Sequence, residues 1–369
     1  MRVKHVISVS GGKDSAATLL LALTRFGPSN VIPIFCDTGN EHQAVYEYLD
    51  YLELALGIKI VRLKANFDNE ITAKRQFIAR DQRTRRQYDT APVFDAAGEP
   101  VPKRDSRGSI IMRTVRRDGH DVVEPVQKTK KVGCGRRMRW SNKAKRRALA
   151  VLQPTGNPFL DLCLWKGRFP SRKAQFCTEQ LKRNPAVEFQ MDLIDQGHTV
   201  VSWQGIRRDE SLNRRSAKRF EEVGGGLYIY RPIVDWTARD VFAYCASHGI
   251  KPNPLYMQGM GRVGCMPCIN VNKAELRQIG ARFPEHVARI HEWEQLVAQA
   301  SKRQATTFIP APGITPGQAK DHGIYSVIEW SRTSRGGRQY DMLVDLIDPE
   351  SCASSHGLCD APVFDLEVV

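Results

Sequence analysis

Apolar residues occur along the first eighty positions in a strand, helix, strand, helix, strand order. Residues 6–9, 31–36 and 58–63 form short apolar runs with the length of buried strands. Residues 16–25 and 41–56, which lie between these runs, carry apolar side chains at helical spacing. Strands that alternate with helices pair in parallel through right-handed crossovers. The pattern therefore predicts an α/β fold, with a mostly parallel sheet and helices on both faces.

This strand and helix pattern stops after residue 80. Residues 81–141 are rich in Gly, Pro and basic residues, and they predict a basic inserted segment with one hairpin. Residues 199–203 and 228–234 predict further strands, and Asp235 is the predicted cap of a helix that extends to about residue 248. The predicted domains are an α/β domain (1–80 and 142–260), the inserted segment (81–141) and a cysteine-bearing C-terminal region (261–369).

A glycine-rich loop separates the first predicted strand from the first predicted helix. Its sequence is Ser10-Gly11-Gly12-Lys13-Asp14-Ser15. Two successive glycines let the backbone amides turn toward phosphate oxygens, and the start of a helix adds its positive dipole end. Lys13 supplies a cation, whereas Asp14 would repel an anion unless it binds Mg²⁺ or holds the loop. Asp37 follows the second strand at the same edge of the sheet and could bind Mg²⁺ in the same way.

The chain carries a net charge of +15, and basic residues are concentrated in and just after the inserted segment. Between Pro125 and Ala150 there are ten Lys and Arg residues and no acidic residue. This composition favours a polyanionic partner, nucleic acid above all, although a solvated basic arm has the same composition. Trp140 beside Arg139 adds an aromatic ring, a combination typical of nucleic-acid surfaces.

Cellular location is indicated by two features that the sequence lacks. There is no run of about 18 apolar residues that could span a bilayer, and no N-terminal signal sequence. We therefore expect a cytoplasmic protein without a membrane partner. Because thiols stay reduced in that compartment, the nine cysteines indicate metal ligation or thiol chemistry rather than disulfides.

Cys265 and Cys268 form a C-x-x-C pair on a turn that contains Gly and Pro. Such a pair binds zinc, binds a [4Fe–4S] cluster, acts as a redox pair, or occurs by chance. Cys134 lies in the basic segment and is a candidate reactive thiol that could carry a persulfide. Three other cysteines lie among apolar residues and are predicted core residues: Cys36, Cys163 and Cys245.

The glycine-rich loop resembles the PP-loop of the adenine nucleotide alpha-hydrolase-like enzymes. Three further segments resemble the phosphoadenosine phosphosulfate (PAPS) reductase family, namely residues 37–41 (Asp-Thr-Gly-Asn-Glu), 205–211 (Gly-Ile-Arg-Arg-Asp-Glu-Ser) and 231–236 (Arg-Pro-Ile-Val-Asp-Trp). The resemblance covers about residues 3–80 and 160–280. It implies the adenine nucleotide alpha-hydrolase-like fold and a nucleotide site in which Arg207 and Arg208 contact anionic groups.

The resemblance also extends to the cysteines. Residues 167–182 resemble the cluster-binding stretch of bacterial adenylyl sulfate reductases, in which two adjacent cysteines precede a basic residue, but Phe176 stands at the first of these two positions. The matching ligands of a [4Fe–4S] cluster are Cys177, Cys265 and Cys268. Either Cys352 or Cys359 in the tail supplies the fourth ligand, or the fourth iron stays open and binds sulfide. The small residues between the two tail cysteines favour closure by the tail.

Two chemistries occur among the relatives that this resemblance indicates. Reductases release sulfite from PAPS or adenylyl sulfate, whereas sulfur-transferring relatives keep the full loop and split ATP into AMP and pyrophosphate. The intact loop favours an ATP pyrophosphatase and sulfurtransferase that adenylylates an acceptor and inserts sulfur, similar to the sulfur-transfer component of DNA phosphorothioation. Its expected catalytic residues are Lys13, Asp14 and Cys359.

The expected cofactors of such an enzyme are ATP, Mg²⁺ and the cluster. The expected partners are nucleic acid and either a sulfur-donor protein, such as a cysteine desulfurase, or a thiol reductant, and the chain could form a homo-oligomer. One alternative is a reductase that uses Cys359 as its nucleophile and binds PAPS or adenylyl sulfate. Another is a nucleic-acid-binding regulator with a structural cluster.

Overall fold

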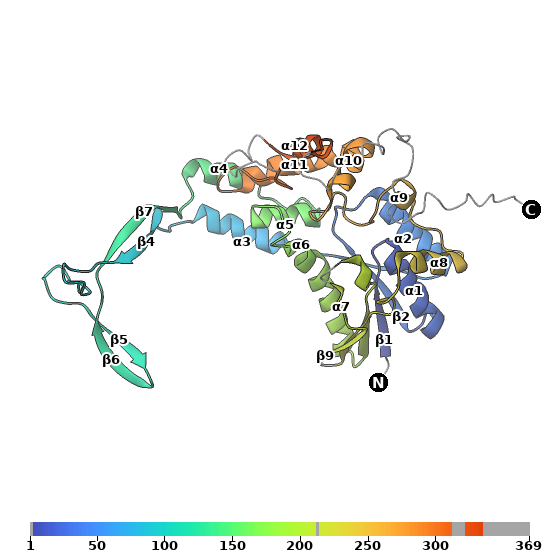
Figure 1. Ribbon diagram of the computed structural model, residues 1–369, viewed down its shortest axis with the longest axis horizontal. Helices are drawn as coiled ribbons and strands as arrows, with labels where there is room; N and C mark the ends of the chain where they lie inside the picture. Colours follow the sequence, from blue (N-terminus) through green and yellow to red (C-terminus); the bar gives the residue numbers. More distant parts are fainter. Residues whose placement is uncertain (1–2, 212–213, 312–321, 335–369) are drawn as a thin grey trace, which may run out of the picture. The chain divides into compact units, whose positions relative to one another are not determined.

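The computed structural model describes residues 3–211, 214–311 and 322–334 of the chain (Figure 1). The chain divides into two compact units. The main unit consists of Met1–Lys74 and Arg147–Val369, and the inserted unit of Arg75–Arg146. None of the helices in the described ranges has both the length and the apolarity needed to cross a membrane.

A six-stranded sheet forms the centre of the main unit, in the order β3-β2-β1-β8-β10-β9. Its strands are β1 (Val3–Ser8), β2 (Val31–Asp37), β3 (Val61–Lys64), β8 (Thr199–Trp203), β9 (Phe220–Gly224) and β10 (Leu227–Tyr230). Neighbouring strands pair in parallel, except that β9 is antiparallel to β10 at one edge. The predicted α/β class with a mostly parallel sheet is therefore confirmed.

Helices cover both faces of this sheet. Helix α7 (Asn184–Asp195) lies on one face, and α1 (Lys13–Phe26) and α8 (Ala238–Ser247) pack against each other on the opposite face (Figure 1). Because strand side chains alternate between faces, Val6 of β1 and Ile34 of β2 point toward α7, where Phe189 packs against them. This apolar layer holds the strand ends that carry the candidate site.

The remaining elements of the main unit surround this layer. They are α2 (Gln43–Leu56), α5 (Pro158–Lys166), α6 (Phe176–Thr178) with a π-helical turn (Glu179–Arg183), a 3₁₀ turn (Arg208–Glu210), α9 (Pro254–Met257), α10 (Lys273–Arg282), α11 (Pro284–Ala300) and α12 (Ile324–Ser331). Helices α3 (Asp68–Ala79) and α4 (Asn142–Val151) contain the two unit boundaries.

The predicted cap of α8 is wrong by two residues. Thr237 caps the helix, because its Oγ1 accepts a hydrogen bond from the Asp240 amide at 3.2 Å and the Asp240 carboxylate accepts one from the Thr237 amide at 2.8 Å. Asp235 instead pairs with two guanidinium groups, those of Arg208 and Arg219.

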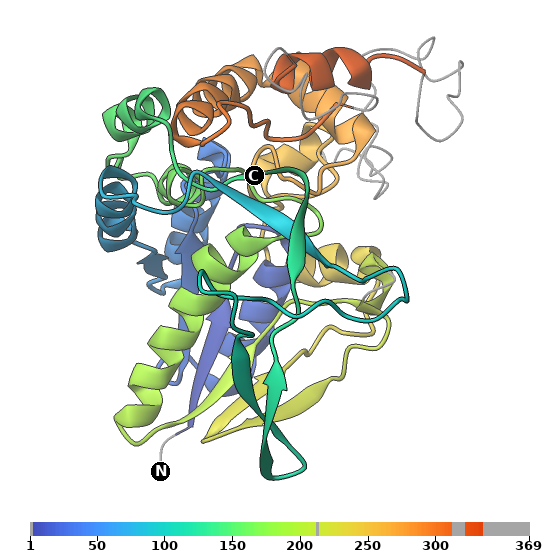
Figure 2. The same cartoon turned by 90° about the vertical axis from the view of Figure 1, so that its left-hand side faces the viewer.

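The inserted unit contains two antiparallel ribbons rather than the one predicted hairpin (Figure 2). Strand β5 (Met112–Arg117) pairs with β6 (His120–Pro125) through a tight turn. Strand β4 (Arg86–Pro92) pairs with β7 (Thr129–Arg137), which lies about forty residues further along the chain. Local sequence patterns do not reveal such a distant pairing, and this explains the missed ribbon.

His5 links β1 to β8 and to the end of α1. The residue is 7% exposed, its ring stacks on Phe26 with centroids 3.7 Å apart, and its Nδ1 accepts a hydrogen bond from Trp203 Nε1 at 3.1 Å. Burial lowers the pKa of His5 below its ordinary value. A protonated ring could not accept the Trp203 bond.

We predict that this contact makes stability depend on pH. Because the pKa of His5 is lower in the folded than in the unfolded chain, its contribution is fully present above about pH 6.5 and is lost as the pH falls below that value. Urea unfolding of the native chain and of His5→Phe should therefore differ more in unfolding free energy at about pH 7.5 than at about pH 5. An equal difference at both values would contradict the assigned bond.

Candidate functional site

The glycine-rich loop lies at the point where the order of the sheet reverses. After β1 the chain continues to β2 on one side, whereas β8 lies on the other side of β1 and is followed by β10. Ligands of open α/β sheets bind beyond the carboxyl ends of the strands at such a switch point. The loop after β1 and the turn after β8 therefore form the two sides of the candidate nucleotide site.

Gly205 permits the close approach of these two segments. A Cβ atom at this position would lie 2.8 Å from the carbonyl oxygen of Asp14 and 3.1 Å from the amide nitrogen of Ser15. Both are backbone atoms at the start of α1, so a side chain at position 205 would force the turn away from the helix. The first residue of the predicted 205–211 motif must therefore be glycine, because there is no room for a side chain at this position.

The loop is held in one conformation by its own side chains and by its neighbours. Gly11 has a φ of +73°, and a Cβ atom there would lie 2.9 Å from Val45 Cγ1. Ser15 Oγ accepts a hydrogen bond from the Ser10 amide at 3.0 Å and donates one to the Gly12 carbonyl at 2.9 Å. These contacts place the N-terminus of α1, with its positive dipole end, at the candidate site.

Lys13 occupies an aromatic pocket at the start of α1. It is 7% exposed, and its ammonium group lies 5.3 Å from the ring centroid of Tyr256 and 5.8 Å from that of Phe242. The Tyr256 hydroxyl also accepts a hydrogen bond from the Lys13 amide at 3.1 Å. The cation is therefore held at the positive end of the helix, where it adds to the attraction for an anion.

Asp14 does not face the site as an isolated negative charge. Its Oδ1 accepts a hydrogen bond from Arg207 Nε at 2.5 Å, and its Oδ2 lies 3.5 Å from the Lys13 ammonium. The Arg207 side chain is only 3% exposed and also pairs with Asp209. Arg207 therefore neutralises Asp14 from behind the loop, which differs from the predicted direct contact with a nucleotide.

Arg208, the other arginine predicted to contact the nucleotide, is directed to partners within the chain. It pairs with Asp235, and its Nε and Nη2 donate to the Ala217 carbonyl at 3.0 and 2.8 Å. These bonds connect the turn after β8 to the segment that precedes β9.

Asp37, at the end of β2, fits a Mg²⁺ ion better than Asp14 does, because both oxygens of Asp14 already face cations. Asp37 Oδ1 accepts hydrogen bonds from the Gly39 amide at 2.9 Å and the Tyr46 hydroxyl at 2.7 Å. These bonds fix the carboxylate at the mouth of a cavity of about 630 Å³ in the main unit.

A His–Glu–His set lines the same cavity. The ligand atoms of His42, Glu285 and His286 all lie within 4.8 Å of one another. However, His42 Nδ1 accepts a hydrogen bond from the Ala44 amide at 3.0 Å and thereby caps α2. The neutral ring then carries its proton on Nε2 and has no lone pair for a metal, so we do not assign a metal site to this set.

The C-x-x-C turn is supported by the segment that follows β2. The Met266 amide donates to the Asn40 carbonyl at 2.8 Å, and the Asn40 side chain donates to the Pro267 carbonyl at 3.0 Å. The Cys265 thiol donates to Glu41 Oε1 at 3.5 Å, and burial raises the pKa of Cys265 to about 12. The 37–41 motif thus joins the nucleotide side of the main unit to its cysteines.

Three cysteines predicted as cluster ligands influence one another electrostatically. Burial raises the pKa of Cys177, and the neighbouring Cys268 thiolate raises it further. The Lys182 ammonium has its pKa raised chiefly by Cys265, and also by Cys268. A metal centre with thiolate ligands carries negative charge, and a nearby lysine is a suitable counter-charge for it.

The described part of the chain contains no three cysteine sulfurs as tightly gathered as the ligands of a single ion. A cluster of several irons holds its ligand sulfurs further apart than one zinc ion does, so this arrangement is compatible with a cluster. The two proposed tail ligands, Cys352 and Cys359, lie outside the described residues, and so does the catalytic role given to Cys359.

Cys36, predicted as a core residue, lies instead beside the segment that contains Lys182. Its thiol donates to the Lys182 carbonyl at 3.3 Å, the residue is half-buried, and burial raises its pKa to about 11. The interpretation as a core residue fits Cys163 and Cys245, which are buried. The signal that could have identified Cys36 is its position next to Asp37, at the functional end of β2.

Comparison with known proteins identifies the family of the chain. The model of the phosphoadenosine phosphosulfate reductase domain matches residues 4–96 and 138–271. A protein of Escherichia phage 186, described as an uncharacterized 37.8 kDa protein in the gpa 5′ region, is 40% identical over 369 aligned positions, which cover 96% of each chain.

Reductases are also among the similar proteins. An adenosine 5′-phosphosulfate reductase of Neisseria meningitidis is 39% identical over 71 residues, which are 19% of this chain and 29% of the reductase. The crystal structure of the PAPS reductase from Candida auris covers 73% of this chain and 83% of its own, with 14% identity and a TM-score of 0.37. Because the domain model matches more than half of the residues of this chain, the chain belongs to the phosphoadenosine phosphosulfate reductase family.

Proposed function

We propose that the chain is an iron–sulfur ATP pyrophosphatase that adenylylates an acceptor and replaces the activated oxygen with sulfur. The observation that carries this proposal is the intact loop, which presents an N-terminal helix end, Lys13 and a neutralised Asp14 on one side of the sheet. The positive end of the α1 dipole and the Lys13 ammonium suit a leaving pyrophosphate. A reductase, which releases no pyrophosphate, has less need of these groups.

The proposed reaction has two steps. In the first, an acceptor hydroxyl oxygen attacks the α-phosphorus of ATP, its proton passes to solvent, and the bond to the pyrophosphate oxygen breaks. The amides at the start of α1 and the Lys13 ammonium stabilise the charge that develops on the pyrophosphate. Asp37 would hold a Mg²⁺ ion that neutralises the same group.

In the second step, a hydrosulfide-level sulfur attacks the activated acceptor, the bond to the AMP oxygen breaks, and AMP leaves with the bonding electron pair. A sulfur-donor protein such as a cysteine desulfurase supplies the sulfur as a persulfide, and a thiol reductant supplies the two electrons that release it as hydrosulfide. Residues Cys177, Cys265 and Cys268 would hold a [4Fe–4S] cluster. When bound, the cluster supplies iron that has affinity for sulfide.

A reductase that releases sulfite is the second candidate. The 39% identity with an adenosine 5′-phosphosulfate reductase, over a segment of 71 residues, favours this candidate. In that case Cys359 would be the nucleophile, and the loop would bind the phosphates of an existing adenylyl sulfate.

We predict that the chain releases pyrophosphate and AMP from ATP when an acceptor is present. Lys13→Ala should slow this release by about 10²-fold or more, because it removes a cation from the leaving group. Lys59→Ala is the matched control, since the Lys59 side chain is 84% exposed and pairs with Glu53, and it should leave the rate unchanged. The assay is anaerobic, with DNA, RNA and small hydroxyl compounds as acceptors.

Two results would contradict the proposal. Sulfite release from PAPS with a thiol reductant, without pyrophosphate release from ATP, would identify a reductase. If neither product forms while nucleic acid still binds, the chain acts as a regulator.

We also predict that Cys265→Ser and Cys268→Ser each remove most of the iron and acid-labile sulfide from anaerobically purified protein. Cys134→Ser, which changes an exposed cysteine of the inserted unit, should leave both unchanged. Separate Cys352→Ser and Cys359→Ser variants identify the fourth ligand, and closure by the tail predicts a loss in one of them. Unchanged iron in both, with a loss in Cys36→Ser, would assign that role to Cys36 instead.

A further inference from the structure

The inserted unit carries most of the net charge of the chain. Residues 75–146 contain 20 Lys and Arg and 8 Asp and Glu, which gives +12 of the total +15. A field of this strength on 72 residues attracts a polyanion at long range.

The β4–β7 ribbon exposes basic side chains to solvent, and its two strands have no hydrophobic core of their own. Most side chains of β7 are exposed, including those of Lys130, Lys131, Arg136 and Arg137. A two-stranded ribbon in water is marginally stable by itself. A partner that covers the faces of the ribbon would therefore stabilise the ribbon. Because the ribbon is basic, the surface of that partner must be negatively charged.

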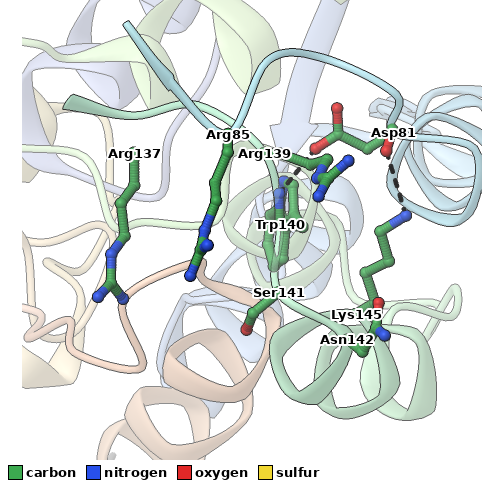
Figure 3. A pocket seen from close by; sticks show the side chains of 8 residues that line it. All are labelled: Asp81, Arg85, Arg137, Arg139, Trp140, Ser141, Asn142 and Lys145. Carbon is green, nitrogen blue, oxygen red and sulfur yellow. Dashed lines mark hydrogen bonds between the residues drawn. The ribbon is translucent and has the colours of Figure 1, made fainter. Parts of the chain in front are cut away.

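One end of this ribbon adjoins a cavity of about 460 Å³ (Figure 3). Arg85, Arg137, Arg139 and Lys145 line it, together with Ser141 at the start of α4. Figure 3 shows the side chains of Arg85 and Arg137 side by side and pointing in the same direction. Ser141 Oγ accepts a hydrogen bond from the Ala144 amide at 3.2 Å and caps the helix, whose positive dipole end faces the same cavity.

Asp81 is the one carboxylate among the residues that line this cavity, and it does not repel a bound anion. Asp81 accepts hydrogen bonds from Arg83 Nε at 2.8 Å and from the Trp140 amide at 2.8 Å. These bonds hold the pKa of Asp81 well below its usual range. The Trp140 ring is 8% exposed, so it forms a wall of the cavity, and the expected stacking on a base is not available to it.

We propose that the inserted unit binds duplex DNA, with the β4–β7 ribbon in the major groove and the cavity of Arg85, Arg137 and Arg139 on a backbone phosphate. The major groove of B-form DNA admits a two-stranded ribbon, whereas the major groove of A-form RNA is too deep and narrow. Arginine binds phosphate through a fork of two donors. This inference rests on the proposed function, because it names DNA as the molecule that carries the acceptor.

Fluorescence anisotropy of the full chain with a labelled DNA duplex about 25 base pairs long tests the proposal, at several salt concentrations. The triple variant Arg85→Gln, Arg137→Gln, Arg139→Gln should weaken binding by about 10²-fold and reduce the slope of log affinity against log salt by about 1, because the cavity holds one phosphate. The corresponding triple Arg→Lys variant keeps the charge and should retain most of that slope.

The matched control removes three exposed cations from the main unit, through Lys59→Gln, Arg239→Gln and Lys251→Gln. It changes the net charge equally and should leave both the slope and the affinity close to the native values. Equal losses in the two Gln variants would overturn the proposal, as would tighter binding of an RNA duplex of the same sequence.

This binding measurement requires neither ATP nor sulfur, so its outcome is separate from that of the proposed function. DNA binding without pyrophosphate release would contradict the enzyme proposal alone. Pyrophosphate release with a small acceptor, without DNA binding, would contradict the inference about the inserted unit alone.

Discussion

The ion pair between the buried Arg207 and the half-buried Asp14 is the interaction on which the glycine-rich loop depends. It connects the turn after β8 to the first turn of α1, across the point where the sheet changes direction. Gly205 makes the distance short enough for the pair to form. Breaking such a pair by removing one partner is costly, because it leaves an uncompensated charge. Here that charge would also lie in the candidate nucleotide site.

A second constraint links the nucleotide side of the main unit to its cysteines. The segment after β2 contributes Asp37 to the cavity and, four residues later, Glu41 to the Cys265 thiol. Asn40 holds the C-x-x-C turn through two hydrogen bonds. A displacement at the end of β2 would therefore affect both the cavity that Asp37 lines and the C-x-x-C turn. This shared support gives a physical reason why a nucleotide motif and a cysteine motif occur together in one chain.

The sequence predicts those features that depend on local patterns. The first three strands, the first two helices and the glycine-rich loop follow from periodicity and from residues that are adjacent in the chain. The pairing of Arg207 with Asp14 could not be predicted, because the two residues are 193 positions apart and only the folded sheet brings them together. The same reason applies to the β4–β7 ribbon and to Cys36 beside Lys182. The hydrogen bond from the Trp140 amide to Asp81 likewise joins residues that are 59 positions apart.

A double-mutant cycle on ATP binding tests the central claim most directly, namely that Arg207 neutralises Asp14 so that the loop can hold phosphate. Calorimetry would give the ATP affinity of the native chain, Arg207→Met, Asp14→Asn and the double variant, each first shown to be folded by circular dichroism. The account predicts that Arg207→Met weakens binding by at least about tenfold, or about 1.4 kcal/mol, and that adding Asp14→Asn restores most of this loss. Independent effects, with the double variant weaker than either single variant, would contradict it.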